Sequence, residues 1–290
     1  MEIKTVAIIG AGIMGHGIAQ VSAAAGCDVF LNDVDEKYLQ AAKAKIGDSL
    51  DRFVKKAKIS EADKNQILSR ISLSTHLENA VKGADLIVEA VSENLELKQA
   101  IFRKLSANAP AGAVLATNTS QYSITEIASV VASPERVIGM HWFNPPVLMK
   151  LIEIVRGYQT SEQTVARVQA FAAKVGKETV VCKDSQGFIS TRALMALRLE
   201  CYRIFEEGIA TKEDIDKTLR LALGHPMGQF ELADFSGLDL DLPAAEGLTS
   251  VFGDRFRAPQ TIRNLVKAGK LGRKSGQGWY NYADSGSGKA

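Results

Sequence analysis

Residues 4–15, KTVAIIGAGIMG, decide the fold of the first part of this chain. Their first six residues form a short apolar, β-branched run, which is typical of a fully buried parallel strand. The Ala-, Ile- and Val-rich stretch that follows predicts a helix from Ile13 to Ala25, ended by Gly26. A second strand is predicted over 28–33. Strand, glycine turn, helix and strand within about 30 residues make one βαβ unit.

The glycine turn reads GxGxxG, and it stands where that pattern has meaning, directly after a buried strand and at the start of a helix. Its first glycine permits a tight turn, its second lets the backbone approach a pyrophosphate, and its third allows close packing of helix on strand. The helix N-terminus offers free N–H groups and a partial positive charge to phosphates. The expected contacts come from Gly10, Gly12, Ile13, Met14 and Gly15.

An acidic residue, Asp33, ends the second strand eighteen residues after Gly15. A carboxylate at this point accepts hydrogen bonds from the adenosine ribose hydroxyls and repels a 2′-phosphate. The next residues, Val34, Asp35 and Glu36, include no arginine that could hold such a phosphate. The sequence therefore predicts that the cofactor is NAD rather than NADP. FAD proteins share the fingerprint, but the catalytic residues described below favour a nicotinamide.

Composition narrows the class of protein. The chain has 290 residues, of which 46% are hydrophobic, so it can bury a sizeable core, and its net charge of only +2 gives no field that would attract nucleic acid or an anionic membrane. The three cysteines are scattered, which argues against a disulfide framework and a structural metal site. No apolar stretch approaches 18 residues, and the N-terminus shows no targeting signal. We expect a cytoplasmic protein with no membrane segment.

Further strands are predicted after a long gap, and the character of the chain changes late. The strand signals lie at 84–90, 113–117, 137–141, 151–155 and 178–182. The gap before them is too long for a simple crossover and predicts a helical pair, the second helix capped by Ser60 with Asp63. The predicted fold class is α/β: a Rossmann-like doubly wound sheet with a helical-pair insertion over 1–184, then a smaller all-α domain over 185–290.

The helical pair carries many lysines. Two interpretations stay open: the lysines form an ordinary solvated face, or they form a basic clamp for a phosphate-bearing substrate tail. The residues concerned are Lys43, Lys45, Lys55, Lys56, Lys58 and Lys64.

One histidine of the four stands out. His141 ends a predicted strand, so its ring lies at the carboxyl edge where open α/β sheets bind ligands. Glu153, twelve residues later, is an isolated carboxylate within an apolar strand, and burial without a partner would be costly. A His141–Glu153 pair would fix the imidazole tautomer and leave one nitrogen to take a proton. A salt bridge of Glu153 with Arg136 or Arg156 is the competing interpretation.

At this point the chain resembles the L-3-hydroxyacyl-CoA dehydrogenase family, in particular its short bacterial 3-hydroxybutyryl-CoA dehydrogenase members. The resemblance runs in order through the whole chain. It rests on GAGIMGHGIAQ at 10–20, DLIVEAVSENLELK at 85–98, TNTS at 117–120, HWFNPP at 141–146, KLIEIV at 150–155, DSQGFISTR at 184–192, LGHPMG at 223–228 and GRKSGQGWYNY at 272–282.

The resemblance implies roles for individual residues. The catalytic His and Glu fall on His141 and Glu153, the substrate-contacting Ser on Ser120, and an active-site Asn on Asn144. It further implies that Glu89 and Lys98 lie along the nicotinamide half of the cofactor groove, that Asn118 lies near the ring, and that the CoA nucleotide meets Lys55 or Lys56. The family pattern GFIxNR has Asn where this chain has Thr191, which puts the substrate preference in doubt.

The implied activity is NAD-dependent oxidation of an L-3-hydroxyacyl-CoA, by a homodimer formed through the C-terminal domain. The acyl group and the physiological direction stay open. Two other functions are weighed against this one: a dehydrogenase of a free hydroxy acid or sugar acid on the same scaffold, and a non-catalytic NAD-binding structural protein.

Overall fold

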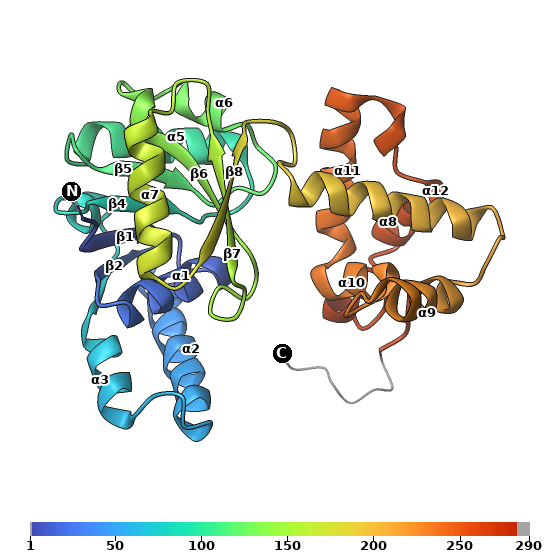
Figure 1. Cartoon of the computed structure of the whole chain (residues 1–290), viewed down its shortest axis with the longest axis horizontal. Coiled ribbons are helices and arrows are strands. Elements are labelled where there is room, and N and C mark those ends of the chain that lie inside the picture. The colour runs from blue at the N-terminus through green and yellow to red at the C-terminus, as the bar shows by residue number, and fades with distance from the viewer. Residues whose placement is uncertain (1, 283–290) are drawn as a thin grey trace. The chain divides into compact units, whose positions relative to one another are not determined.

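The computed structural model describes residues 2–282, and the chain divides into two compact units, one ending at Phe188 and the other beginning at Ile189 (Figure 1). The sequence placed this boundary after residue 184. The first unit is an α/β domain built on one sheet, and the second consists of helices. Each unit has a buried apolar core of its own.

The sheet of the first unit has eight strands in the order β3-β2-β1-β4-β5-β6-β7-β8. Neighbouring strands are parallel, except that β7 runs antiparallel to β6. The carboxyl ends of β1, β4, β5 and β6 therefore meet at one edge. The strands are β1 (Thr5–Ile9), β2 (Asp28–Asn32), β3 (Ile71–Ser74), β4 (Leu86–Glu89), β5 (Val114–Thr117), β6 (Val137–Trp142), β7 (Leu151–Arg156) and β8 (Glu178–Lys183).

Helices cover both faces of this sheet, because alternate strand residues point to opposite sides. Val6 and Ile8 pack with α1, α2 and α7, whereas Ala7 and Ile9 pack with α4, α5 and α6. In Figure 1, α7 crosses in front of the strands, and α2 and α3 lie side by side below them. The helices are α1 (Ile13–Ala24), α2 (Glu36–Lys55), α3 (Glu61–Ser69), α4 (Leu77–Val81), α5 (Leu95–Asn108), α6 (Ile124–Ala128) and α7 (Glu162–Lys174).

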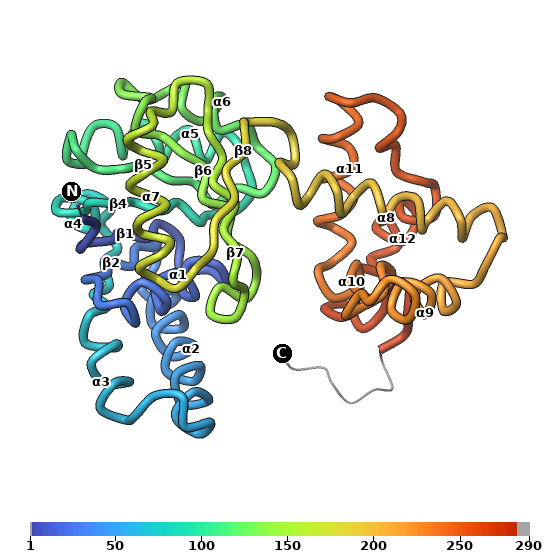
Figure 2. Tube along the Cα trace, viewed as in Figure 1, coloured from blue at the N-terminus to red at the C-terminus, as the bar shows by residue number. Residues whose placement is uncertain are grey.

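The helical pair α2 and α3 is present as predicted, and Ser60 and Asp63 form the predicted capping box at the start of α3. The prediction that no strand lies between residues 33 and 84 is wrong. From α3 the chain runs back toward β2 (Figure 2) and forms β3, a short edge strand that, among the described residues, pairs only with β2. Its sequence, ISLS, is too short and polar to give a strand signal, because an edge strand needs only one apolar contact face.

The second unit contains α8 (Ser190–Glu206), α9 (Lys212–Leu223), α10 (Gln229–Ser236), α11 (Leu238–Phe252) and α12 (Gln260–Lys267). Its core is aromatic: Tyr202, Phe230 and Trp279 contact one another. The buried carboxylate of Asp234 accepts the backbone N–H groups of Trp279 and Tyr280, which fixes the last described segment against α10. Among residues 2–282, no helix is long and apolar enough to cross a membrane.

Candidate active site

The glycine turn joins β1 to α1, and two of its glycines are required by the fold itself. Gly10 has a φ of +104°, and a Cβ there would lie 2.7 Å from the Ala90 carbonyl oxygen. A Cβ on Gly15 would lie 1.7 Å from the Gly10 carbonyl oxygen. Neither position accepts a side chain, because both contacts are with backbone.

Gly12 is different, because a Cβ there would meet no atom of the chain within 4 Å. The fold therefore does not require this glycine, and it is exposed at the N-terminus of α1. The first bond within α1 runs from the His16 N–H to the Gly12 carbonyl, so the preceding N–H groups are not used within the helix. The first turn also holds no acidic side chain. This open, positively polarised cradle fits the pyrophosphate of NAD.

We expect Gly12→Ala to weaken NADH binding by about tenfold or more, which corresponds to about 1.4 kcal/mol. The added methyl group projects into the space that a pyrophosphate needs, and it touches nothing in the protein. The thermal midpoint should therefore stay that of the parent protein. Fluorescence titration with NADH measures the binding. Unchanged affinity in a stable Gly12→Ala protein would mean that the phosphates do not approach this turn.

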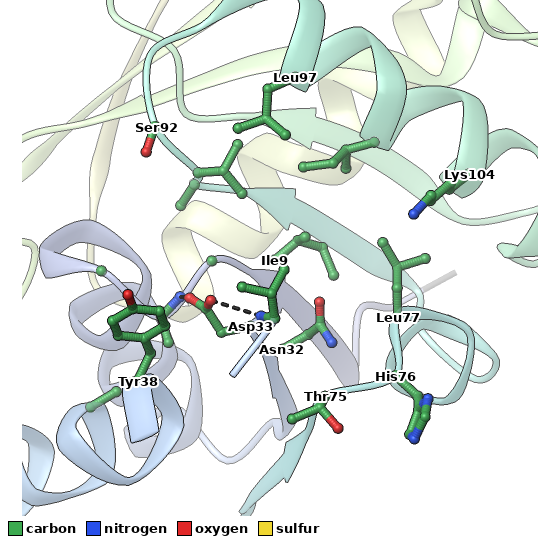
Figure 3. A pocket seen from close by; sticks show the side chains of 18 of the residues that line it. Ile9, Asn32, Asp33, Tyr38, Thr75, His76, Leu77, Ser92, Leu97 and Lys104 are labelled. Carbon is green, nitrogen blue, oxygen red and sulfur yellow. Dashed lines mark hydrogen bonds between the residues drawn. The ribbon is translucent and has the colours of Figure 1, made fainter. Parts of the chain in front are cut away.

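Asp33 lies directly after β2. Besides its predicted contact with the adenosine ribose, its carboxylate accepts hydrogen bonds from the backbone of the protein. Its Oδ2 accepts the Ala11 N–H at 2.7 Å, and its Oδ1 accepts the Val34 N–H at 2.7 Å (Figure 3). The carboxylate thus holds the glycine turn against the end of β2. Its remaining lone pairs face a cavity and are available to ribose hydroxyls.

That cavity has a volume of about 690 Å³ and lies between the ends of β1 and β2, α2 and α5. Figure 3 shows Tyr38, Thr75, Leu77 and Lys104 around it, with Asp33 at its base. Its walls are mixed, with apolar side chains and a few polar groups, as is usual for a site that holds an adenosine. The glycine turn forms one end, so a dinucleotide can continue from here along the carboxyl edge of the sheet.

His141 and Glu153 lie farther along the same edge and are hydrogen-bonded to each other. They occupy opposed positions in the antiparallel pair β6 and β7. The His141 Nδ1–H donates to Glu153 Oε2 at 2.6 Å, and the two residues are 7% and 1% exposed. The carboxylate fixes the tautomer in which Nδ1 carries the proton, so Nε2 is left as a proton acceptor.

Neither competing arginine approaches Glu153 in this way. Arg156 forms a salt bridge with Glu162, and Arg136 donates to the Pro110 carbonyl oxygen. The strand pairing explains the difference, because Arg136 precedes β6 and Arg156 ends β7.

Ser120 follows β5, and its neighbour Glu93 was missed by the sequence analysis. The Ser120 N–H donates to Glu93 Oε1 at 2.9 Å, and the hydroxyl of Thr119 donates to the same oxygen at 2.5 Å. The other Glu93 oxygen lies 3.0 Å from Lys98 Nζ. Glu93 therefore fixes the loop that carries Ser120. The available signal was its position in the loop after the carboxyl end of a parallel strand, where ligand-site residues gather.

Glu89 and Lys98, which are expected along the nicotinamide half of the cofactor groove, lie at the end of β4 and on α5. Both are buried, at 0% and 1% exposure, and Lys98 Nζ donates to Glu89 Oε1 at 2.8 Å. Glu89 also accepts the Thr117 hydroxyl, so it joins β4, β5 and α5 beneath the site. Burial lowers the pKa of Lys98, but the attraction of Glu89 and Glu93 outweighs it, and the net pKa is raised.

Two asparagines flank the His–Glu pair. The Asn118 side chain accepts the Trp142 N–H at 3.0 Å, which ties the end of β5 to the end of β6. Asn144 is exposed in the loop after β6. The next part of this loop, Pro146, packs on α1 at Gly17, where a Cβ would lie 2.9 Å from the proline ring. The loop is thus held between the sheet and the helix that follows the glycine turn.

The remaining predicted residues lie on α2 and on α8. Lys55 and Lys56 are exposed at the C-terminal end of α2, and Thr191 is the second residue of α8 in the helical unit. Lys64 pairs with Asp51. Within residues 2–282, no group of three or more His, Cys, Asp or Glu side chains is arranged to hold a metal ion.

Comparison with known proteins covers both units. Residues 5–185 match the NAD-binding domain of 3-hydroxyacyl-CoA dehydrogenase, and residues 187–282 match the C-terminal domain of the same enzyme family. A Bacillus subtilis protein named probable 3-hydroxybutyryl-CoA dehydrogenase is 44% identical, over 98% of this chain and 99% of its own length.

Two further relatives agree. The mitochondrial hydroxyacyl-coenzyme A dehydrogenase of Rattus norvegicus is 41% identical over 97% of this chain and 91% of its own. The crystal structure of (S)-3-hydroxybutyryl-CoA dehydrogenase from Ralstonia eutropha matches with a TM-score of 0.94 and 41% identity, covering 97% of this chain and 99% of that one.

Proposed function

Because this chain belongs to the 3-hydroxyacyl-CoA dehydrogenase family and is an NAD-dependent oxidoreductase, we propose that it oxidises the L-3-hydroxy group of a short acyl-CoA to the 3-oxo group. 3-Hydroxybutyryl-CoA or a close relative is the proposed substrate, in keeping with the names of the Bacillus and Ralstonia relatives. The observation that carries the proposal is the buried hydrogen bond between His141 and Glu153 at the carboxyl edge of the sheet.

His141 acts in this proposal as the general base. Its Nε2 accepts the proton of the substrate 3-hydroxyl, while Nδ1–H stays on Glu153. The Glu153 carboxylate stabilises the imidazolium that forms. The electrostatic attraction between them is strong because the pair is buried, where the dielectric constant is low. Bound NAD⁺ supplies the hydride acceptor. General base catalysis of this kind contributes about 10²–10⁴ in rate.

Ser120 and Asn144 have a positioning role toward the reacting oxygen. Glu93 holds the backbone of Ser120, and the Asn118 amide oxygen fixes the end of β6. These contacts limit the motion of the groups that meet the substrate, which is the condition for an effective near-attack geometry. Thr191, which stands where the family pattern has Asn, is proposed to tune the acyl preference.

The nucleotide end of CoA has a candidate site on the first unit. A groove of about 510 Å³ lies along α1 and α2, with Val21, Leu50 and Phe53 among its apolar walls. Lys58 Nζ lies over the Phe53 ring at 5.6 Å, and Lys150 lines the groove from the loop before β7. An apolar wall with cations at its rim suits an adenine and its phosphates.

Charge reversal at Lys55 and Lys56 should raise KM for acetoacetyl-CoA by about three- to tenfold and leave kcat nearly unchanged, because exposed charges contribute modestly and act on binding. The effect should shrink as salt is added. Lys82, exposed at the end of α4 rather than of α2, supplies the matched Lys→Glu control; it lines neither cavity, as is also true of Lys55 and Lys56. If the double variant keeps the control's KM at low salt, these lysines belong to an ordinary solvated face.

One steady-state comparison tests the proposed function. NADH oxidation is measured with acetoacetyl-CoA, with longer 3-oxoacyl-CoA esters and with free acetoacetate. The proposal expects the acetoacetyl-CoA ester to give the highest kcat/KM and free acetoacetate to give little turnover. Preference for the free acid would favour a hydroxy-acid dehydrogenase, and tight NADH binding without turnover of any ester would favour a structural protein.

The helical unit is proposed to form a homodimer. It exposes large apolar side chains, among them Leu221 at 76%, Ile209 at 68% and Phe235 at 53%. Such a surface on one domain is typical of an oligomer contact. Sedimentation equilibrium should give twice the chain mass of 31.3 kDa, and a monomer at micromolar concentration would rule the dimer out.

A further inference from the structure

Phe188, the last residue of the first unit, has an unusual backbone conformation. Its φ is +49°, directly after Gly187 at +71°, although its bulky side chain is 4% exposed. A left-handed conformation is unfavourable for such a residue and persists only where the surrounding structure holds it. Such positions gather at functional sites, so the contacts of this residue need an explanation.

The segment is held at both ends. Asp184 accepts the Ser123 hydroxyl and the N–H groups of Ile124 and Thr125, which places the segment on the N-terminus of α6. At the other end, the Phe188 N–H donates to the Ser185 carbonyl at 2.9 Å and closes a turn. The turn directs the Phe188 ring into the core below β6 and β7.

The ring meets the catalytic imidazole there. The centroids of Phe188 and His141 are 5.8 Å apart with the planes tilted by 59°, and Phe143 lies 4.7 Å from the same imidazole at 49°. Both distances fall within the range of favourable ring contacts. Phe143 is partly exposed, whereas Phe188 is buried. Of the two aromatic rings beside His141, Phe188 is therefore the one that lies in the protein interior.

We propose that Phe188 is a positioning residue for the reaction. Its ring holds the His141 imidazole on Glu153 and keeps water from the bond between them. A hydrogen bond to a charged group is strong in a dry, low-dielectric site and weakens when water can compete. The strained backbone serves this purpose, because the turn closed by the Phe188 N–H brings the ring to the imidazole. The inference rests on the proposed role of His141 as general base.

The test must separate the ring from the backbone and from general packing. Phe188→Leu keeps apolar bulk and loses the aromatic contact. Phe188→Gly removes the ring and also relieves the left-handed strain, since glycine adopts this φ freely. Phe102→Leu is the matched control. Phe102 lies on α5 in the same buried cluster and is 0% exposed, and the substitution removes a ring of the same size. Phe188→Met serves if the leucine variant does not fold.

Three readouts are taken: kcat with acetoacetyl-CoA, the Kd of NADH, and, on the NADH-bound protein, the low-field proton NMR signal of the His141 Nδ1–H. We expect both Phe188 variants to lower kcat by about 10- to 100-fold, the scale of a misplaced catalytic group. Their NADH affinity should stay within about twofold of the parent. The low-field signal should weaken or exchange faster with water. Phe102→Leu should keep both kcat and signal.

Full activity in Phe188→Gly, or a kcat of Phe188→Leu equal to that of Phe102→Leu, would overturn the proposal, as would an unchanged low-field signal. His141→Gln, measured alongside, separates this failure from that of the proposed function. If His141→Gln is inactive while Phe188→Leu is fully active, only the role of Phe188 is wrong. If His141→Gln itself remains active, the general base is another group.

Discussion

His141→Gln should lower kcat by about 10²–10⁴ while NADH still binds with the affinity of the parent protein. Glutamine has no group that accepts and returns a proton at neutral pH, so the step assigned to Nε2 is lost. The adenosine cavity and the glycine turn lie at a different part of the sheet edge, where this substitution changes nothing. Stopped-flow reduction of acetoacetyl-CoA measures the first effect, and NADH fluorescence measures the second.

Glu153→Gln, measured in the same assay, tests whether the charge of Glu153 supports His141. The amide oxygen can still accept the Nδ1–H, but it lacks the charge that stabilises the imidazolium. Its kcat should therefore fall between those of the parent and His141→Gln. If the His141 variant retained parental kcat, the assigned chemistry would be wrong; if the Glu153 variant did, the carboxylate would have only a packing role.

Lys98→Met should lower the free energy of unfolding of the NAD-binding unit by about 3–5 kcal/mol, because it leaves a buried carboxylate without its cation. Lys98 Nζ lies 2.8 Å from Glu89 and 3.0 Å from Glu93, and the Lys98 and Glu89 side chains are almost fully buried. The loss is a large fraction of the stability of an ordinary domain. Because Glu93 also holds Ser120, kcat should fall as well.

The measurement can be confined to one unit. The chain has two tryptophans, Trp142 in the first unit and Trp279 in the second, so a Trp279→Phe background lets urea unfolding be followed at Trp142. Lys64→Met, which breaks the more exposed pair with Asp51, is the control and should change the midpoint little. Equal midpoints for the two lysine variants would mean that the buried pair does not stabilise the site.

The stability contributed by the buried Lys98 ion pair should depend on pH. The pKa of Lys98 is raised in the folded protein, because Glu89 and Glu93 outweigh the effect of burial. A raised pKa of a cationic group contributes stability that is complete below its unfolded value and is lost as the pH rises through the folded value. The difference in stability between the parent and Lys98→Met should therefore persist through neutral pH and decline only in the alkaline range.

The sequence by itself determined the parts of this protein that are encoded by neighbouring residues. The glycine turn and the capping box at Ser60 depend on residues a few positions apart, and the acid Asp33 belongs to the same βαβ unit as the turn; the structure has all three. The sequence also identified the family, because the family's motifs run in order through the whole chain. Local patterns failed to show the short edge strand β3, which has too little apolar surface to give a signal.

Only the tertiary structure decided how distant residues meet. The antiparallel pairing of β7 with β6 places Glu153 opposite His141. Arg136 and Arg156 could also have paired with this carboxylate, but the register of the strands places His141 beside it, and the two arginines contact other groups. The tertiary structure likewise buries Lys98 and pairs its charge with that of Glu89. These outcomes depend on packing and desolvation across long sequence separations, which no local pattern records.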